Sequence, residues 1–266
     1  GVWIREPKEL NMKRLLGLLL VMGMVGCGPS EEEKAAALEK ETAAALEKES
    51  AAALETLGAK IKLTHKGRVM EVQLTDTKIT DAGLGHLREL TKLEFLYIAN
   101  TQITDAGLVH LKGLTNLRRL SLPNTQITAA GLAHIKSLNY LDTLWVQDTK
   151  VTDAGLVDLK GLTNLRNINL GGTQITDAGL VHLKELTNLH SLGLRSTQIT
   201  SAGLVHLKEL ANLNSFDLRD TQVTAAGLVL LKGMNNLTVV RLNENQVTDE
   251  GVAELQKALP KCSIAK

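Results

Sequence analysis

The chain has 266 residues, of which 44% are hydrophobic, so it is long enough to bury one large core. Its net charge is +1, and removal of residues 1–26 takes away four basic and two acidic residues, which leaves −1. This near-neutral balance excludes nucleic-acid binding driven by general electrostatic attraction. The two cysteines, Cys27 and Cys262, exclude a disulfide framework.

Residues 1–26 form the predicted signal-peptide region. The segment "MKRLLGLLLVMGMVGC" begins at Met12, the expected native start, and residues 1–11 are either an over-long gene start or added sequence. Lys13 and Arg14 supply the basic part and residues 15–25 the apolar part. Eleven apolar residues are too few to span a bilayer as a helix. The segment therefore indicates export rather than a membrane-spanning anchor.

The tetrapeptide "MVGC" that ends at Cys27 resembles the bacterial lipobox, in which the cysteine becomes the lipidated first residue of the mature protein. Met24 departs from the usual Leu or Val. Gly28 stands where Asp commonly signals retention in the inner membrane, so the resemblance favours an outer membrane in a cell that has two. Two or more acyl chains on Cys27 would hold the protein firmly at a membrane, whereas one chain is marginal.

Residues 27–58 are predicted to contain the lipidated cysteine and a helical spacer. The sequence echoes "AAALEK" every eight residues and consists of strong helix formers. Its leucines drift around a helix instead of forming a straight seam, which favours a spacer over a coiled coil. Residues 59–68 then predict an N-terminal cap hairpin, with a turn at His65, Lys66 and Gly67.

Residues 69–248 contain eight copies of a 24-residue repeat. The phrase "TQITDAGLVHLK" begins at Thr101 and again at Thr173. In each copy a short strand-like run precedes a turn, and leucines three residues apart then favour a short helix, with Thr104 and Asp105 suited to a helix start. Such a unit cannot bury its apolar faces alone, so the copies must stack. The equivalent positions at the start of this phrase are Thr77, Thr101, Thr125, Thr149, Thr173, Thr197, Thr221 and Asn245.

The repeat resembles the leucine-rich repeat family, whose pattern L-x-x-L-x-L-x-x-N appears as "LRRLSLPNT" from Leu117 and "LHSLGLRST" from Leu189. "ITDAGL" resembles bacterial members of the family with a helix on the convex side. Threonine replaces the family's ladder asparagine in seven copies, and we expect its hydroxyl to satisfy buried backbone groups instead. The fold class is therefore α/β, a leucine-rich repeat solenoid, or horseshoe, with a parallel sheet on the concave face. Residues 249–266 are predicted to close it with a capping helix and a truncated strand.

Departures from the repeat predict the binding site. The chain has six aromatic residues, and three of them fall at outward positions of the predicted concave face. Exposed aromatic residues on such a face are where binding energy concentrates, so Phe95, Tyr97, Arg119 and Trp145 form the predicted anchor patch. Farther along, Gly171, Gly172 and Gly193 predict a bare notch, and a polar rim follows that could pair with an acidic partner group through Arg195, Arg219 and Arg241.

The sequence contains no motif of a hydrolase, a phosphate-binding loop or a zinc site, so we predict no catalytic residues, no metal and no cofactor. A column of histidines on the helices, including His86 and His110, has its members about 10 Å apart, too far to share a metal. Lysines beside it, such as Lys112, predict a basic convex stripe, which interleaved acids make a solvated face.

The resulting hypothesis is a non-enzymatic, exported lipoprotein of the bacterial cell envelope, anchored through Cys27, that acts as a scaffold and binds a protein partner on its concave face. Three alternatives stay open. The ligand is a glycan that stacks on Trp145 and Tyr97, the arrays associate with one another as structural elements of the envelope, or the protein is an intracellular adaptor whose signal is not used.

Overall fold

The computed structural model describes residues 30–242 and 247–266. The predicted signal peptide, Cys27 and Asn245 of the eighth repeat lie outside the described residues. The chain divides into two compact units, residues 1–43 and 44–266, and all the repeats belong to the second. Within the described ranges, every helix is too short or too polar to traverse a bilayer.

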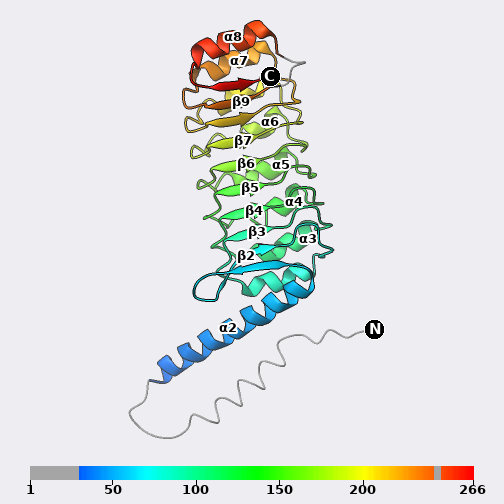
Figure 1. Ribbon diagram of the computed structural model, residues 1–266, viewed down its shortest axis with the longest axis vertical. Coiled ribbons are helices and arrows are strands. Elements are labelled where there is room, and N and C mark those ends of the chain that lie inside the picture. The colour runs from blue at the N-terminus through cyan, green and yellow to red at the C-terminus, as the bar shows by residue number, and fades with distance from the viewer. Residues whose placement is uncertain (1–29, 243–246) are drawn as a thin grey trace. The chain divides into compact units, whose positions relative to one another are not determined.

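One ten-stranded sheet runs through the second unit, with its strands in sequence order (Figure 1). β1 pairs antiparallel with β2, and every later pair is parallel, in a register that joins residues 24 apart, such as Leu96 and Leu120. This confirms the predicted α/β solenoid. The strands are β1 (Lys60–Leu63), β2 (Val69–Gln73), β3 (Phe95–Tyr97), β4 (Arg119–Ser121), β5 (Thr143–Trp145), β6 (Asn167–Asn169), β7 (Ser191–Gly193), β8 (Ser215–Asp217), β9 (Val239–Arg241) and β10 (Ser263–Ala265).

Short helices cover the opposite side of the repeats (Figure 1). Most are a single α-helical turn, and several continue as, or are replaced by, a 3-10 helix. The α-helical turns are α3 (Asp105–Leu108), α4 (Ala129–Leu132), α5 (Asp153–Leu156), α6 (Asp177–Leu180) and α7 (Ala225–Leu228). The 3-10 helices are η1 (Gly83–Glu89), η2 (Val109–Leu111), η3 (Val157–Leu159), η4 (Gly203–Leu207) and η5 (Val229–Gly233).

The core between sheet and helices is a single hydrophobic cluster built from the repeated leucine positions. In the second repeat Leu93, Leu96 and Ile98 of the strand side and Leu108 and Leu111 of the helix side are fully buried. The same positions are buried in the later copies that the structure describes, except at Val252 of the last copy, which is partly buried, and Phe216 occupies one of them in β8. Because each layer packs on the next, the core is continuous from one end of the stack to the other.

Buried threonine hydroxyls close the turns that follow β3 to β8. Thr101 Oγ1 donates to the carbonyl oxygen of Ile98 at 3.1 Å, and Thr173 Oγ1 donates to that of Leu170 at 2.5 Å. The residue before the threonine adopts the left-handed conformation in six copies, and Gly172 does so in a seventh. The hydroxyl thus satisfies a carbonyl of its own repeat, which confirms that threonine takes over backbone satisfaction from the family's asparagine.

Aspartates at the start of the short helices join consecutive repeats. Asp153 Oδ1 accepts from the Thr176 N–H at 2.8 Å, and its Oδ2 accepts from the Thr176 hydroxyl at 2.6 Å. The same pair of bonds joins Asp81 to Thr104, Asp105 to Thr128 and Asp177 to Thr200. We expected this acid to act mainly near the positive end of its own helix. Its stronger contacts are with the threonine that caps the next helix.

The close approach of the aspartate carboxylate to the next repeat requires the glycine of "AGL". A Cβ atom at Gly131 would lie 2.4 Å from Asp105 Oδ1, closer than atoms can pack. The glycine therefore leaves room for the carboxylate of the neighbouring repeat, and it also allows the helices to pack closely. Ala129 breaks the series, so Thr152 receives no such carboxylate, and its side chain caps no backbone N–H.

The end of the predicted spacer helix covers the first repeat. Helix α2 (Glu31–Thr56) is continuous, and its residues from Ala44 onward belong to the same unit as the repeats. Leu54 is fully buried, and the buried Glu47 carboxylate accepts from the Val69 N–H at 2.6 Å and from Arg68 Nε. We expected a spacer that ends at residue 58, but its last three turns also act as a cap, together with β1.

The C-terminal end is closed by α8 (Asp249–Ala258) and β10. Thr248 caps α8 by accepting from the Gly251 N–H at 3.2 Å, and β10 adds to β9 in the same 24-residue register as the repeats. Cys262 is buried beneath them, and burial raises the pKa of its thiol. The thiol therefore stays protonated and unreactive at neutral pH.

The Asp–Thr bridge predicts two stability changes of opposite sign. Asp153→Ala removes two charge-assisted hydrogen bonds and should lower the free energy of unfolding by about 1 to 3 kcal/mol. Ala129→Asp supplies the missing acceptor for Thr152 and should raise it by about 1 kcal/mol. Urea unfolding followed by circular dichroism measures both. If both variants unfold at the wild-type midpoint, the bridge contributes nothing to stability.

Candidate binding surface

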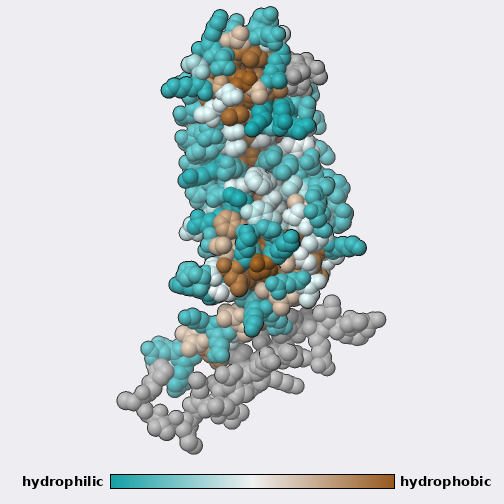
Figure 2. Space-filling model, in the orientation of Figure 1, coloured by the Kyte–Doolittle hydropathy of each residue, from teal (hydrophilic) through white to brown (hydrophobic). Residues whose placement is uncertain are grey.

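The exposed face of the sheet carries two columns of side chains, because each three-residue strand points its middle residue inward and its outer two outward. On β3 these are Phe95 and Tyr97, both half-buried, with Leu96 between them fully buried. Figure 2 shows hydrophilic and neutral residues over the middle of the stack and hydrophobic ones toward β1 and β2 and toward β9 and β10. The surface is therefore not uniformly apolar, and its few aromatic side chains stand out.

The four residues predicted as the anchor patch lie together. The Arg119 guanidinium lies over the Phe95 ring, 5.9 Å from its centroid, and over the Trp145 ring, 5.7 Å from its centroid. Arg119 Nη1 also donates to the Tyr97 hydroxyl at 3.3 Å. Ser121 is small and buried between the strands that carry Tyr97 and Trp145. We call Phe95, Tyr97, Arg119 and Trp145 the aromatic–arginine patch.

Arg119 holds this patch in one arrangement. Each cation–π contact at a partly exposed site is worth about 0.5 to 1 kcal/mol, so two of them restrain the arginine and both rings. Arg119 Nε is buried and has no hydrogen-bond partner among the described residues. A planar guanidinium can stack on two rings and still direct other N–H groups outward, whereas a lysine could not. The patch is thus a rigid, amphipathic surface of three rings around one cation.

A hollow of about 550 Å³ lies beside the patch, on strands β5 to β9. The glycines of the predicted notch, Gly171, Gly172 and Gly193, all line it. Trp145 lines it too, so this residue belongs both to the aromatic–arginine patch and to the hollow. The absence of side chains at the three glycines creates the space, as the sequence indicated.

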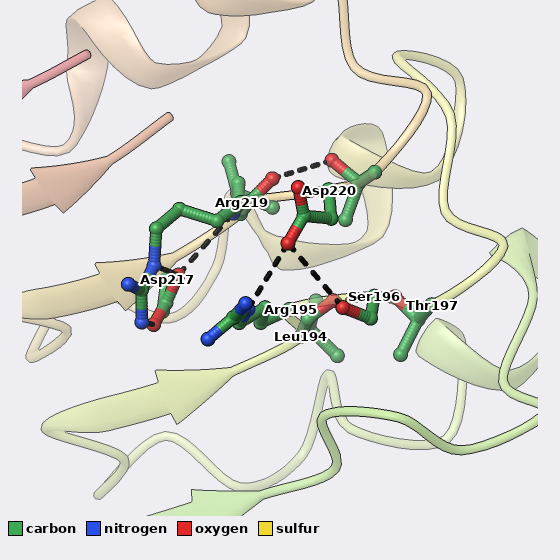
Figure 3. Close-up of polar contacts among 9 residues, drawn as sticks. Leu194, Arg195, Ser196, Thr197, Asp217, Arg219 and Asp220 are labelled. Carbon is green, nitrogen blue, oxygen red and sulfur yellow. Dashed lines mark hydrogen bonds and ion pairs between the residues drawn. The ribbon is translucent and has the colours of Figure 1, made fainter. Parts of the chain in front are cut away.

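The predicted arginine rim lines the same hollow, but two of its three arginines are paired within the chain (Figure 3). Asp217 accepts from Arg219 through two oxygens, at 2.9 Å from Nε and 2.7 Å from Nη2. Arg195 Nε donates to Asp220 at 3.0 Å. Arg241 is exposed and makes no ion pair with a described residue. Among the described residues, Arg241 is thus the one arginine of the predicted rim that forms no ion pair, and the other two are held by acids of the chain.

The Asp217 carboxylate is held in its charged form. Partial burial acts to raise its pKa, but hydrogen bonds from the Arg219 side chain and backbone N–H, with the charges of Arg219 and Arg241, outweigh burial and lower the pKa below its ordinary value of 3.8. Its bond in turn raises the pKa of Arg219. The pair is ionised throughout the physiological pH range.

The helix face shows no built site among the described residues. No three of their His, Cys, Asp or Glu side chains gather closely enough to hold a metal ion. Desolvation and the charge of Arg88 lower the pKa of His110, whose Nδ1 is buried without a hydrogen-bond partner among the described residues. His182 Nδ1 is buried in the same way. Both histidines occupy the same position of their repeats.

Gln147 and Tyr140 are two further polar side chains outside the sequence-predicted site. Gln147 lines the hollow from two positions after the end of β5, and its Oε1 is buried without a donor among the described residues. Tyr140 is 61% exposed and replaces the asparagine of "TNL", whose Nδ2 elsewhere donates to the preceding repeat, as Asn164 does to the Asn139 carbonyl at 2.7 Å. Aligning the copies on their asparagines would have revealed Tyr140.

The geometry agrees with two family comparisons. Residues 91–134 match the family described as "Leucine Rich repeats (2 copies)", and residues 161–184 and 233–255 match "Leucine Rich repeat". The chain therefore contains leucine-rich repeats. Comparison with curated proteins finds no match.

Solved structures of leucine-rich repeat proteins share the fold. Internalin C2 of Listeria monocytogenes is 25% identical, with a TM-score of 0.51 over 65% of this chain and 80% of the internalin. A leucine-rich repeat protein of Leptospira interrogans is 20% identical, with a TM-score of 0.54 over 68% of this chain. The match spans 51% of the Leptospira protein, about half its length. The family's repeats suggest a protein-binding scaffold, and its members are typically not enzymes.

Acid should remove the stabilising effect of Asp217. Because the folded-state pKa is lowered, the stabilisation is fully present above the ordinary pKa of 3.8 and is lost as pH falls through the folded-state value. Asp217→Asn should therefore lower the free energy of unfolding by about 0.5 to 1.5 kcal/mol at pH 7. This difference should shrink below pH 3.8 in urea titrations at several pH values.

Asp158→Asn, on the helix face, is the matched control. Its free energy of unfolding should differ little from that of the wild type at neutral pH. A difference between wild type and Asp217→Asn that is the same at pH 7 and in acid would contradict the assignment of the ion pair.

Proposed function

We propose that this leucine-rich repeat protein is a non-enzymatic scaffold that binds a protein partner on the exposed sheet face, at the aromatic–arginine patch. The observation that carries the proposal is the stacking of Arg119 between the rings of Phe95 and Trp145, with Tyr97 beside them. Tryptophan, tyrosine and arginine are the residues most enriched at the centres of protein–protein interfaces. The patch gathers all three on one rigid sheet.

Preorganisation supports the proposal. A partner loses affinity when flexible side chains must be ordered on binding, at about 0.5 to 1.5 kcal/mol for each. The cation–π contacts and the Tyr97 hydrogen bond already order these side chains in the free protein. Their backbone positions are set by adjacent parallel strands whose residues pair in register. A partner would therefore meet a surface with little conformational entropy left to lose.

We further propose that the protein is exported and anchored in the cell envelope, favouring the outer membrane, through a lipid on Cys27. The support is the charged, apolar and small-residue order that precedes Cys27 in the sequence. The exposed, charged helix α2 follows and provides a polar segment between the anchor and the repeats. At about 1.5 Å per residue, its part before Ala44 adds about 20 Å along the helix axis.

The protein-binding proposal predicts the outcome of crosslinking in a native envelope extract. Tagged full-length protein should recover a specific protein, and the double variant Tyr97→Ala, Trp145→Ala should recover at least about tenfold less, because hot-spot side chains contribute about 2 kcal/mol or more each. Tyr140→Ala, which removes an exposed tyrosine outside the patch, should behave as wild type. Thermal melts verify that all variants are folded.

Equal recovery by the wild type and the double variant would reject the patch as the partner site. The helix face and self-association would then be the next surfaces to test. A fragment that begins at Ala59 is unsuitable for this experiment, because it lacks Glu47 and Leu54 of the N-terminal cap.

The anchoring proposal predicts the intact mass after expression in a bacterial host. The mature chain should begin at Cys27 and carry acyl chains, and it should fractionate with membranes. Cys27→Ser should abolish the added mass and release the protein from membranes. A wild-type mass without cleavage or acyl chains would reject lipidation and favour the intracellular adaptor.

A further inference from the structure

The hollow beside the aromatic–arginine patch has the size and position of a separate ligand site. Its volume of about 550 Å³ falls within the range of roughly 300 to 1,000 Å³ that small-ligand sites occupy. It reaches from Trp145 on β5 to Arg241 on β9, four strand spacings or about 19 Å. The space therefore suits an elongated ligand that lies across the strands.

The charges around the hollow are largely compensated inside the chain. Asp217 pairs with Arg219 through two oxygens, and Asp220 pairs with Arg195 (Figure 3). A site built for an anion would leave its cations available, whereas here only Arg241 makes no ion pair with a described residue. Arginine N–H groups and carboxylate oxygens that are already paired can still form further hydrogen bonds. The walls thus offer donors and acceptors together with little net charge.

Two asparagines that line the hollow each make one side-chain hydrogen bond and keep the other amide atom available to a ligand. Asn169 Oδ1 accepts from the Gly171 N–H at 3.0 Å, so its Nδ2 is the group left to donate. Asn167 Nδ2 approaches Thr143 Oγ1 at 3.3 Å, so its Oδ1 is left to accept. The Ser191 and Ser215 hydroxyls lie on the next two strands of the same surface. A hydroxyl group both donates and accepts hydrogen bonds, so a ligand rich in hydroxyl groups could use the donors and the acceptors of this surface.

Gly193 maintains this surface. A Cβ atom at this position would lie 2.6 Å from Asn169 Oδ1, so any side chain would displace the asparagine and fill the hollow. Trp145 forms the wall nearest the patch and carries Arg119 against its ring, which restrains the indole. An aromatic face has partial negative charge, and the C–H groups of a sugar ring pack well against it.

We propose that this hollow binds a neutral oligosaccharide, with Trp145 as the stacking wall and Asn167, Asn169 and the Asp217–Arg219 pair as the hydrogen-bonding groups. This site is additional to the proposed protein-binding patch. The two share Trp145, so a saccharide chain and a protein partner could be held side by side on one sheet. Gly193 is specific to the hollow and separates the two sites experimentally.

Tryptophan fluorescence tests the proposal directly. The chain has two tryptophans, so full-length protein carrying Trp3→Phe reports on Trp145 alone. The probes are linear tetrasaccharides of β-1,4-linked glucose, β-1,4-linked N-acetylglucosamine and α-1,4-linked glucose, titrated to millimolar concentrations at low and high salt. At least one should change the emission with saturation, and its affinity should vary less than twofold with salt, because the ligand carries no charge.

Two glycine variants locate the site. Gly193→Ala should weaken the binding of that saccharide at least tenfold. Gly161→Ala, where a Cβ atom meets nothing within 4 Å, should bind as the wild type does. Gly193→Ala should also recover the protein partner normally, so the failure of one proposal is distinguishable from the failure of the other.

Three results would overturn the proposal. The first is no response to any of the three saccharides. The second is a response that Gly193→Ala leaves unchanged, because binding would then lie elsewhere. The third is binding of a tetraglutamate peptide that salt weakens, with no saccharide binding, which would make the hollow an acidic-peptide site centred on Arg241.

Discussion

Parallel pairing of each strand with the strand 24 residues later is the interaction on which the rest of this molecule depends. A single repeat has a leucine side on its strand and another on its helix, and neither is covered by the repeat itself. Pairing in register places each leucine layer directly on the next, so that the core is buried to completion between β2 and β9. A shift of one residue would turn the inward-facing side chains of a strand toward solvent.

Polar contacts make that register specific. The threonine hydroxyl closes the turn within its own repeat, whereas the Asp–Thr bridge and the asparagine amides, such as Asn188 to the Thr163 carbonyl, reach from one repeat to its neighbour. Leucine packing alone would tolerate small slips between layers. A carboxylate that must meet both an N–H and a hydroxyl, over a glycine with no Cβ, does not.

The proposed binding surface arises where the repeat is interrupted without disturbing this framework. Outward positions of the strands contribute nothing to the core, so Phe95, Arg119 and Trp145 can differ there at little cost to folding. These side chains can form one binding surface because they lie next to one another on adjacent strands. The same principle explains the hollow, because removing side chains at Gly171 and Gly193 leaves the backbone ladder intact. In such an array the repeated residues build the fold, and the residues that differ between repeats form the proposed binding surface.

The sequence by itself determined the repeat period, the strand-and-helix unit, the direction of stacking and the residues of the aromatic–arginine patch. Strict periodicity does this, because once one copy is placed, all equivalent residues follow at fixed spacing. The position of the glycine notch followed for the same reason. Outward-facing residues on neighbouring strands can be recognised as neighbours before any coordinates are known.

Only the tertiary structure decided how the side chains use that proximity. The stacking of Arg119 on two rings, the pairing of Arg219 with Asp217 and the use of Glu47 as part of a cap depend on rotamers and burial, which spacing does not encode. The composition of the spacer predicts a helix but does not indicate whether its leucines are solvated or buried. The sequence therefore did not show that the end of this helix covers the first repeat. Periodicity sets where a residue lies, and packing between neighbours sets what it contacts.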